Sequence, residues 1–539
     1  MKLRSAMGIG SITCLIIKRD RLRLTLWILG IAFLTMSLTA TFKNVFTDDA
    51  ELISMITMFM ANPAMRVFLA PASGVSLGGF IMMRSSTVIA VLIALFSILT
   101  IIRHTRQNEE IGRSDMMGSL AVGRHAGLLA SVIVTVCSNL LIALLLAGTF
   151  IGFGLPAEGA LAAGAALGMM GIAFTGLAAI CAQLAESSRG ANGLGGLVIG
   201  ASFLFSAIGN MLGTLEAGGT QLSSTWPVWL SPFGWYQQVH AFHQNNSWMI
   251  VIPAVCFIIC LIVALKLENH RDVGAGMIPA GRGPERAAAY LLKPAGLAFR
   301  LQRSSLFIWL AVMAVLGVIF GLSSGEFNEA ISDLDRADEI FGDVFDMDEI
   351  FMMIIIAILS SFSIFYTVQA FSRMLSEEKN GFLDNLMATK LSKMKWLISH
   401  MLFVYIGTAS VIAMTGIAAA VTSAGNPDIR FMKVIESAVI QIPAAFILAG
   451  LAMLFFGYLP RWSTSLAWLV LGISLMAGPF LGPALDLPDW IKNLSPFTHV
   501  PEPTETIKLM PMAAMSAISV LLTAAGMFGF YNRSLKRQM

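Results

Sequence analysis

The stretch Thr87-Val-Ile-Ala-Val-Leu-Ile-Ala-Leu-Phe-Ser-Ile-Leu-Thr-Ile-Ile102 contains no charged side chain. With the residues from 79 onward it makes a run long enough to cross a bilayer, which takes about 20 residues of α-helix. In lipid, each backbone N–H and C=O must be satisfied within its own segment. The run therefore predicts a membrane-spanning helix over 79–102.

Similar apolar runs recur along the whole chain. We predict further spans near 24–42, 129–150, 160–184, 192–213, 248–267, 306–322, 351–371, 397–419, 434–458, 464–482 and 510–531. The 539 residues are 56% hydrophobic and only 12% charged, against about 25% charged in soluble domains. This composition excludes a soluble enzyme, a disordered chain and a nucleic-acid-binding protein. The predicted fold is an all-α polytopic membrane protein with about twelve transmembrane helices.

Lys and Arg are unevenly distributed among the predicted loops. They gather in the N-terminal segment, in 103–128, in 268–305, after the eighth span and in the C-terminal tail, whereas 214–247 has none. By the positive-inside rule, the cation-rich segments are cytoplasmic. We therefore expect a multi-pass protein of a bacterial plasma membrane with both termini in the cytoplasm. The acidic stretch 326–349 is then extracellular.

The chain repeats itself after about 270 residues. Leu15–Leu24 leads into a span that contains Trp27, and Pro294–Arg303 leads into one that contains Trp309. Each stretch has an apolar stripe with cations opposite, which is typical of a helix that lies in the headgroup plane. We therefore expect an interfacial elbow helix before each half.

Two more features occur in the same order in both halves. Without a gap, Glu109, Gly112, Asp115 and Arg124 align with Glu378, Gly381, Asp384 and Lys393. The motif Leu-Ser-Pro-Phe occurs at 230–233 and again at 494–497. A duplicated six-helix unit explains all three features. We predict a first six-span half over 1–267, a Gly- and Pro-containing cytoplasmic linker over 268–293 and a second half over 294–539.

The sequence has no evident catalytic, nucleotide-binding or metal-binding motif. It lacks the phosphate-binding pattern G-x-x-x-x-G-K-[ST], so it is not expected to hydrolyse ATP, and no catalytic, cofactor or metal site is predicted. His240 and His243 have no Cys or acid at ligand spacing. Arg84 is the notable charge inside a predicted span. It contacts an anionic group of a transported compound, contacts a carboxylate of a neighbouring loop, or reaches back to the lipid headgroups.

The ordered set of motifs resembles a known family of membrane proteins. These are the permease subunits of ABC exporters of the second type, and within them the double-length, polyketide-antibiotic-exporter-like permeases. The resemblance covers nearly the whole chain. It is carried by the elbow at Leu15–Leu24, the segment Arg103–Arg113 with Gly123-Arg124, the motif Leu230–Trp235, and Arg271–Gly276 after the sixth span.

The resemblance implies a permease in the lipid bilayer that exports hydrophobic or amphipathic compounds, such as antibiotics, drugs or lipid-like molecules. It implies two copies of a separate nucleotide-binding ATPase subunit as partners, with ATP and Mg bound there and no nucleic acid. One coupling segment in each half would contact these partners. The residues assigned to these contacts are Glu109, Glu110, Gly112, Arg113 and Asp115, and Glu377, Glu378, Gly381 and Asp384.

The resemblance also assigns the Ser-Pro-Phe motifs to extracellular re-entrant helices: Ser231, Pro232 and Phe233, and Ser495, Pro496 and Phe497. The second half departs from the pattern. If Glu377-Glu378 is taken as the glutamate pair, Lys379 and Asn380 stand where the first half has Ile111, and no Gly-Arg follows, so the two contacts are expected to be unequal. Two other classes stay open at this point. They are an ion-coupled secondary transporter with twelve spans and a membrane sensor or assembly subunit that transports nothing.

Overall fold

A computed structural model describes residues 7–45, 49–61, 63–118, 122–216, 219–272, 274–278, 286–322, 347–379, 381–389, 391–426, 429–478, 488–501 and 509–533. These residues are mostly helical, and the strands β1 (Thr214–Leu215) and β2 (Leu222–Ser223) form a small antiparallel pair. The chain divides into two compact units, Met1–Arg282 and Gly283–Met539. Most of the predicted acidic extracellular stretch, and 279–285 of the predicted linker, lie outside the described residues.

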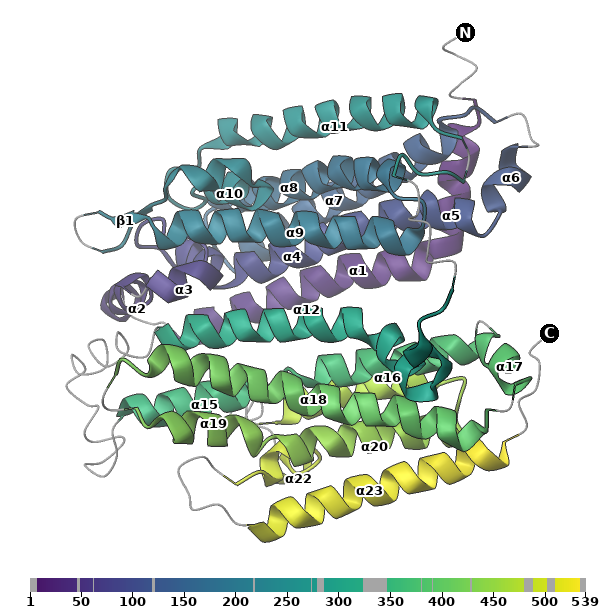
Figure 1. Ribbon diagram of the computed structural model, residues 1–539. Coiled ribbons are helices and arrows are strands. Elements are labelled where there is room, and N and C mark those ends of the chain that lie inside the picture. The colour runs from purple at the N-terminus through teal and green to yellow at the C-terminus, as the bar shows by residue number, and fades with distance from the viewer. Residues whose placement is uncertain are drawn as a thin grey trace. The chain divides into compact units, whose positions relative to one another are not determined.

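Eleven helices among the described residues are long and apolar enough to cross a membrane. In the first unit they are built from α1 (Ile9–Val45), α4 (Leu77–His104), α7 (Ala126–Gly152), α8 (Ala157–Leu184), α9 (Ser188–Met211) and α11 (Val251–His270). In the second they are built from α12 (Pro294–Leu322), α15 (Met347–Ser361) with α16 (Ile364–Lys379), α18 (Lys393–Ser423), α19 (Phe431–Val439) with α20 (Ile442–Tyr458), and α23 (Leu509–Asn532) (Figure 1). The predicted all-α polytopic fold is confirmed.

The predicted span 464–482 is represented by a shorter helix, α21 (Ser463–Ala477). Its 15 residues are apolar, but a complete crossing takes about 20. Residues 479–487, which follow it, are outside the described part of the chain. Eleven long helices and this shorter one therefore stand where about twelve spans were predicted.

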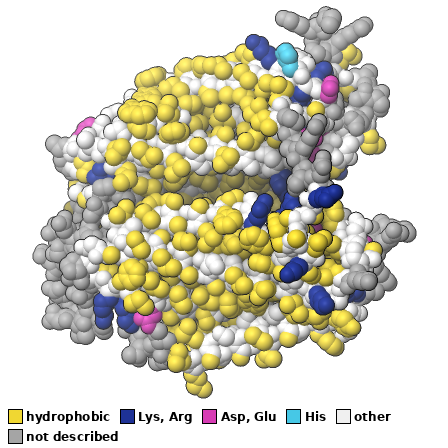
Figure 2. Space-filling view, viewed as in Figure 1, with side chains coloured by type: hydrophobic (Ala, Val, Ile, Leu, Met, Phe, Trp, Pro, Cys, Tyr) yellow, Lys and Arg dark blue, Asp and Glu magenta, His cyan; other side chains and the backbone are white. Residues whose placement is uncertain are grey.

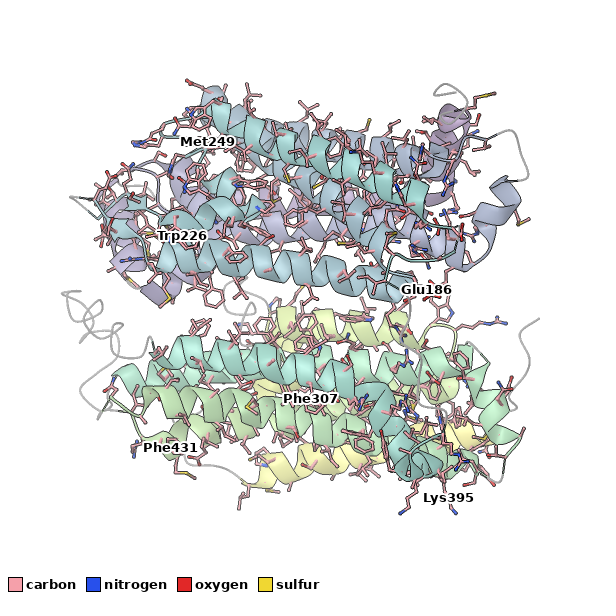
Figure 3. All side chains as sticks on the ribbon, turned by 45° about the horizontal axis from the view of Figure 1, so that its top comes forward. Glu186, Trp226, Met249, Phe307, Lys395 and Phe431 are labelled. Carbon is pink, nitrogen blue, oxygen red and sulfur yellow. The ribbon has the colours of Figure 1, made fainter. Side chains whose placement is uncertain are left out.

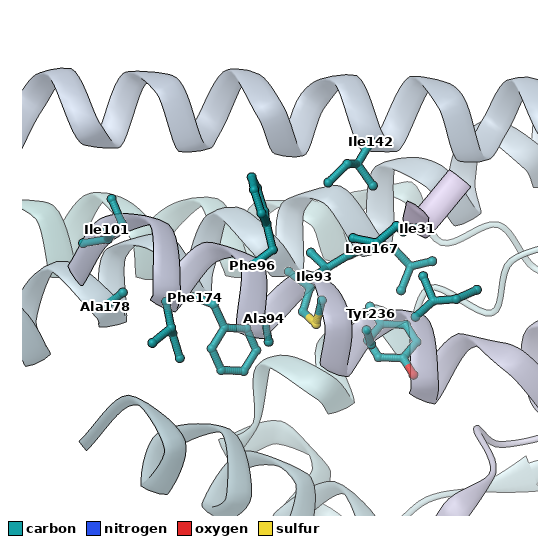
Figure 4. Close-up of a cluster of buried hydrophobic side chains, with 14 of the residues drawn as sticks. Ile31, Ile93, Ala94, Phe96, Ile101, Ile142, Leu167, Phe174, Ala178 and Tyr236 are labelled. Atoms are coloured by element: carbon teal, nitrogen blue, oxygen red, sulfur yellow. The ribbon is translucent and has the colours of Figure 1, made fainter. Parts of the chain in front are cut away.

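In the first unit, α8 packs against α4, α7 and α11. Small residues allow this close packing: a Cβ atom on Gly164 would lie 2.4 Å from the carbonyl oxygen of Ala143, and one on Gly168 would lie 2.6 Å from the Ala143 Cβ. Helices in membranes approach each other through such small residues. Phe96 and Phe174 belong to the apolar core that results (Figure 4).

In the second unit, α12 packs on α18, and α20 packs on α23. The second contact is also close, because a Cβ atom on Gly526 would lie 2.5 Å from the carbonyl oxygen of Met453. Near one end of this pair the buried Trp396 of α18 stacks on Phe530 of α23, with ring centroids 6.0 Å apart. Tight glycine contacts thus occur in the cores of both units.

The two predicted elbows differ. In the first unit, α1 is interrupted at Asp20, whose φ of −107° and ψ of 17° are not helical, and the Asp20 carboxylate accepts a hydrogen bond of 2.6 Å from Arg103 Nε. Ile12 and Ile16 belong to the buried core of this unit, whereas Leu15 is 53% exposed. In the second unit, α12 is one continuous helix from Pro294 to Leu322.

Figure 2 shows hydrophobic side chains over most of the visible helix surfaces, with Lys and Arg side chains toward the helix ends. In Figure 3, Glu186 lies at one end of the first unit's long helices, and Trp226 and Met249 lie toward the other. In the second unit, Lys395 and Phe431 lie at opposite ends in the same way. Each unit thus has two distinct ends.

Candidate functional site

The first predicted coupling segment consists of two short helices joined by a glycine turn. These are α5 (Arg106–Glu110) and α6 (Arg113–Gly118). Between them Gly112 has a φ of 72°, and its N–H donates a 3.0 Å hydrogen bond to the carbonyl oxygen of Glu109. This left-handed conformation costs glycine little and strains other residues. The turn therefore explains why glycine stands at this position.

The aligned segment of the second unit makes the same turn. Here α16 ends at Lys379, Gly381 has a φ of 73°, and α17 (Phe382–Met387) follows. The Gly381 N–H donates a 3.1 Å hydrogen bond to the carbonyl oxygen of Glu378, just as Gly112 does to Glu109. Two glycines that align in the sequence thus have one local geometry.

The Glu109 carboxylate is bound within the first unit. Arg271, the residue directly after α11, donates two hydrogen bonds to it, of 2.6 and 2.8 Å. Arg106 Nη1 donates a third, of 2.9 Å. The side chain of Glu109 is 13% exposed and that of Arg271 is 5% exposed. Glu109 therefore ties the segment to the end of α11 instead of pointing freely outward.

A third arginine donates to a backbone carbonyl beside the Glu109 carboxylate. Arg124 lies just before α7, and its Nη2 donates a 2.7 Å hydrogen bond to the carbonyl oxygen of Arg271. Arg271 Nε in turn donates to the Gln183 side chain near the end of α8, over 2.6 Å. We call Glu109, Arg106, Arg271 and Arg124 the Glu109 network.

The second unit has a matching arrangement. Glu378 forms an ion pair with Arg533, the residue directly after α23. Lys393, which aligns with Arg124, donates a 3.2 Å hydrogen bond to the carbonyl oxygen of Arg533. The Arg533 guanidinium carbon also lies 5.4 Å from the ring centroid of Phe456. We call Glu378, Arg533 and Lys393 the Glu378 network.

Sequence reasoning missed the pairing of Arg271 and Arg533 with the aligned glutamates. Both arginines were noticed only as cations that indicate orientation or as part of a motif. A sequence signal was present, because each lies a few residues after the last predicted span of its half, 248–267 or 510–531. Each directly follows the observed helix, α11 or α23. The structure brings each of them to the glutamate that precedes the glycine turn.

Two further predicted residues of the first segment, Glu110 and Arg113, are exposed. Glu110 is exposed and accepts a 3.1 Å hydrogen bond from the backbone N–H of Ser188, at the start of α9. Arg113 is exposed at the start of α6, and Asp115 belongs to the same helix. Accessible groups for a partner protein thus lie on and beside the short helix α6.

The predicted acids of the second segment differ in exposure. Glu377 is 6% exposed and pairs with Arg373 of its own helix, with a nitrogen–oxygen distance of 3.2 Å. Asp384 is exposed in the first turn of α17. Of the predicted acids in this segment, Asp384 is therefore the one best placed to meet another molecule.

The first Ser-Pro-Phe motif begins the short helix α10 (Pro232–Gln237). The Ser231 hydroxyl accepts a 3.1 Å hydrogen bond from the N–H of Phe233, so it caps the helix. The same hydroxyl donates a 2.6 Å hydrogen bond to the carbonyl oxygen of Ser202 in α9. Ser231 is completely buried, and it anchors α10 to the preceding long helix.

The second motif repeats these contacts at the 3₁₀-helix η5 (Pro496–His499). The buried Ser495 hydroxyl accepts a 3.3 Å hydrogen bond from the N–H of Phe497 and donates a 2.8 Å one to the carbonyl oxygen of Ser474 in α21. The serine of each motif therefore has two roles, as a helix cap and as an anchor to the long helix before it.

Arg84 lies in the first half of α4, and its side chain is exposed. Its guanidinium carbon lies 4.7 Å from the ring centroid of Phe59 in α2 (Asp49–Ala61). At this distance the cation is attracted to the face of the ring. Arg84 therefore presents a positive charge from a membrane-spanning helix, with Phe59 beside it.

Among the described residues, no three His, Cys, Asp or Glu side chains come close enough together to hold a metal ion. The two histidines of the 238–246 loop have another environment. His240 Nδ1 lies 2.9 Å from the Ser73 hydroxyl. Burial lowers the pKa of His240, and His243 lowers it further. His240 thus favours the neutral form and a structural hydrogen bond.

A cavity of about 170 Å³ lies beside the Glu109 network. Its walls include Thr105, Glu109, Arg124, Gln183, Glu268 and Arg271. The cavity therefore lies where the first segment, the start of α7 and the ends of α8 and α11 meet.

Two comparisons with known proteins found similar sequences. Residues 291–531 match a family model described as the C-terminal domain of the multidrug efflux system permease Rv1217c. Over 530 residues the chain is 29% identical to the multidrug efflux system permease protein Rv1217c of Mycobacterium tuberculosis. This match covers 97% of this chain and 94% of that protein. The chain is thus similar over nearly its full length to a protein described as a permease.

Proposed function

We propose that this chain is the membrane permease subunit of an ATP-driven ABC exporter that moves hydrophobic or amphipathic compounds out of the cell. The observation that carries the proposal is the pair of matching segments, each with a left-handed glycine and a glutamate tied to the end of a long helix. The full-length similarity to a multidrug efflux permease supports efflux as the activity. ATP hydrolysis then belongs to separate subunits, which bind ATP and Mg.

Two copies of the ATPase would dock on the cytoplasmic side, one on each segment. Of the predicted contact residues, Glu110, Arg113 and Asp384 are exposed among those whose side chains the structure describes. The more buried Glu109 and Glu378 hold the segments in position through ion pairs with other elements, and Glu377 pairs within its own helix. Closure of the ATPase pair on ATP would move both segments, and each unit would change its packing in response.

Arg84 is proposed to contact anionic groups of transported compounds. Its exposed guanidinium beside the Phe59 ring offers both a charge and an aromatic surface. In transport assays, Arg84→Gln should slow export of the anionic dye calcein more than that of the cationic dye ethidium. Equal slowing of both dyes would contradict a charge-specific contact.

Inverted membrane vesicles from the native cells, with and without this chain, test the central proposal. We expect ATP to drive ethidium into vesicles that contain the chain, and the uptake to persist when a protonophore removes the proton gradient. Uptake that needs the gradient but not ATP would instead show an ion-coupled transporter. A chain that moves neither dye under any condition would fit a sensor or assembly subunit.

Charge reversal at the docking points tests the contacts with the ATPase. Arg113→Glu combined with Asp384→Lys should lower ethidium transport while the folded permease stays in the membrane, because both side chains are exposed. Asp489→Lys is the matched control, since Asp489 is an exposed acid of the second unit in the short helix α22 (Asp489–Lys492), outside both segments. Unchanged transport in the double variant would remove the docking assignment.

A further inference from the structure

We propose that the ion pairs Glu109–Arg271 and Glu378–Arg533 transmit movement of each docking segment to the last long helix of its unit, α11 or α23. This inference rests on the proposed function, because it supplies the step between a docked ATPase and the membrane helices. It assigns Glu109, Arg271, Glu378 and Arg533 as positioning residues. They act through the elements that they join and do not touch the transported compound.

The link in the first unit is made by side chains. The helix α5 packs on α4, α6 and α9, whereas α11 packs mainly on α8. The two hydrogen bonds from Arg271 to Glu109 therefore join two elements whose backbones do not pack extensively together. A bidentate pair of this kind fixes orientation as well as distance. A shift of the segment that carries Glu109 would thus displace the end of α11.

The second unit has the same design. The helix α16 packs on α12, α18, α20 and α21, whereas α23 packs mainly on α20. The pair of Glu378 with Arg533 therefore reaches across to an element that α16 does not otherwise hold closely. That the same contact joins corresponding elements of both units argues for a common role.

The last-named member of each network connects a further helix to it. Arg124 and Lys393, which lie at the starts of α7 and α18, donate to the carbonyl oxygens of Arg271 and Arg533. Because these two cations align in the sequence, the segment, the third long helix and the last helix meet at one point in each unit. A displacement that enters through the segment can therefore reach both long helices.

The first network also has space beside it. Glu109, Arg124 and Arg271 all line the cavity of about 170 Å³. Close-packed side chains resist displacement, because protein interiors have few voids. A cavity next to the network leaves room for the segment to shift without forcing apart the packed helices.

Charge exchange in the second unit gives the sharpest test. We would measure ethidium transported per ATP hydrolysed in vesicles with Glu378→Arg, with Arg533→Glu and with both substitutions together. Each single variant places like charges face to face and should lower the ratio about tenfold, which corresponds to about 1.4 kcal/mol. The double variant restores opposite charges and should recover to within about twofold of the unmodified ratio.

Glu436→Gln is the matched control. It removes an ion pair of α19, Glu436 with Lys433, whose side chains are about one-third exposed and belong to neither network. This variant should leave the transport ratio unchanged. A double charge exchange that is folded but as inactive as the single variants would overturn the proposal, and so would single variants with a normal ratio.

A measurement on the permease alone separates this inference from the proposed function. Spin labels at Asn385 in α17 and Tyr531 in α23, both exposed, report the distance between the two elements. We expect a narrow distance distribution in the unmodified chain, a broad one after Glu378→Arg, and a narrow one again after the double exchange. If vesicles show no ATP-driven transport, the proposed function fails, yet these distances still show whether the pair links the elements. Distributions that the substitutions do not change would overturn the link itself.

Discussion

The two networks share a plan and differ in burial. In the first unit, the Glu109 carboxylate accepts hydrogen bonds from Arg106 and Arg271, whose side chains are 0% and 5% exposed. In the second, Glu378 and Arg533 are about one-fifth exposed, and Oε2 of Glu378 has no hydrogen-bond partner among the described residues. The two units thus share the geometry of the glycine turn, but the ion pair beside it is more buried in the first unit than in the second.

The opposite ends of the units differ in another way. Behind the first Ser-Pro-Phe motif, Gln237 of α10 accepts a 3.1 Å hydrogen bond from Asn210 and lies 3.5 Å from the Tyr236 hydroxyl. Counted from the serine of the second motif, the positions of Tyr236 and Gln237 are taken by Val500 and Pro501. The anchoring serine is common to both units, whereas this buried polar network needs side chains that the second unit lacks at these positions.

The largest expected effect comes from breaking the more buried pair. Arg271→Gln removes a positive charge that neutralises the Glu109 carboxylate in a largely buried site. We expect this to destabilise the end of α11 by about 3 kcal/mol. Arg533→Gln should cost about 1 kcal/mol at α23, because water reaches that pair. Hydrogen exchange of the α11 and α23 amides in detergent measures both. Equal costs would show that burial does not set the difference between the networks.

A smaller and symmetrical effect is expected at the two anchoring serines. Ser231→Ala and Ser495→Ala each remove a fully buried hydroxyl, and with it the hydrogen bond that caps a helix and the one that anchors it. Each should destabilise its unit by about 1.5 kcal/mol. Hydrogen exchange of α10 and of residues 495–500 measures this. Ser399→Ala is the control, since the half-buried Ser399 donates its hydrogen bond to the carbonyl oxygen of Lys395 in its own helix, and it should change little. Unequal costs at the two serines would show that the motifs are not equivalent.

The sequence predicted the long helices well, because an apolar run of sufficient length has few alternatives in lipid. It also predicted that Gly112 and Gly381 correspond, since their spacing from the aligned glutamates can be read directly from the sequence. It could not predict the pairing of Arg271 with Glu109, because the two residues are far apart in the chain. A cation after a span has the same local pattern whether it meets lipid headgroups or a carboxylate. Which apolar residues of a helix are buried depends on the helices packed against it, so the sequence alone does not separate the buried Ile12 and Ile16 from Leu15, which is 53% exposed.

The smallest expected effect isolates the glycine turn from its surroundings. At Gly112 and Gly381 an added Cβ atom would meet nothing within 4 Å, so the φ angles of 72° and 73° alone oppose a side chain. Gly112→Ala and Gly381→Ala should each destabilise the turn by about 1 kcal/mol. Gly193→Ala is a control of opposite sign: its Cβ would also meet nothing within 4 Å, but it lies within the helix α9, where alanine is favoured over glycine by about 1 kcal/mol. Hydrogen exchange of the amides around each site reads out all three changes. If the two turn variants were as stable as the unmodified chain, the left-handed geometry would not be what requires glycine in either unit.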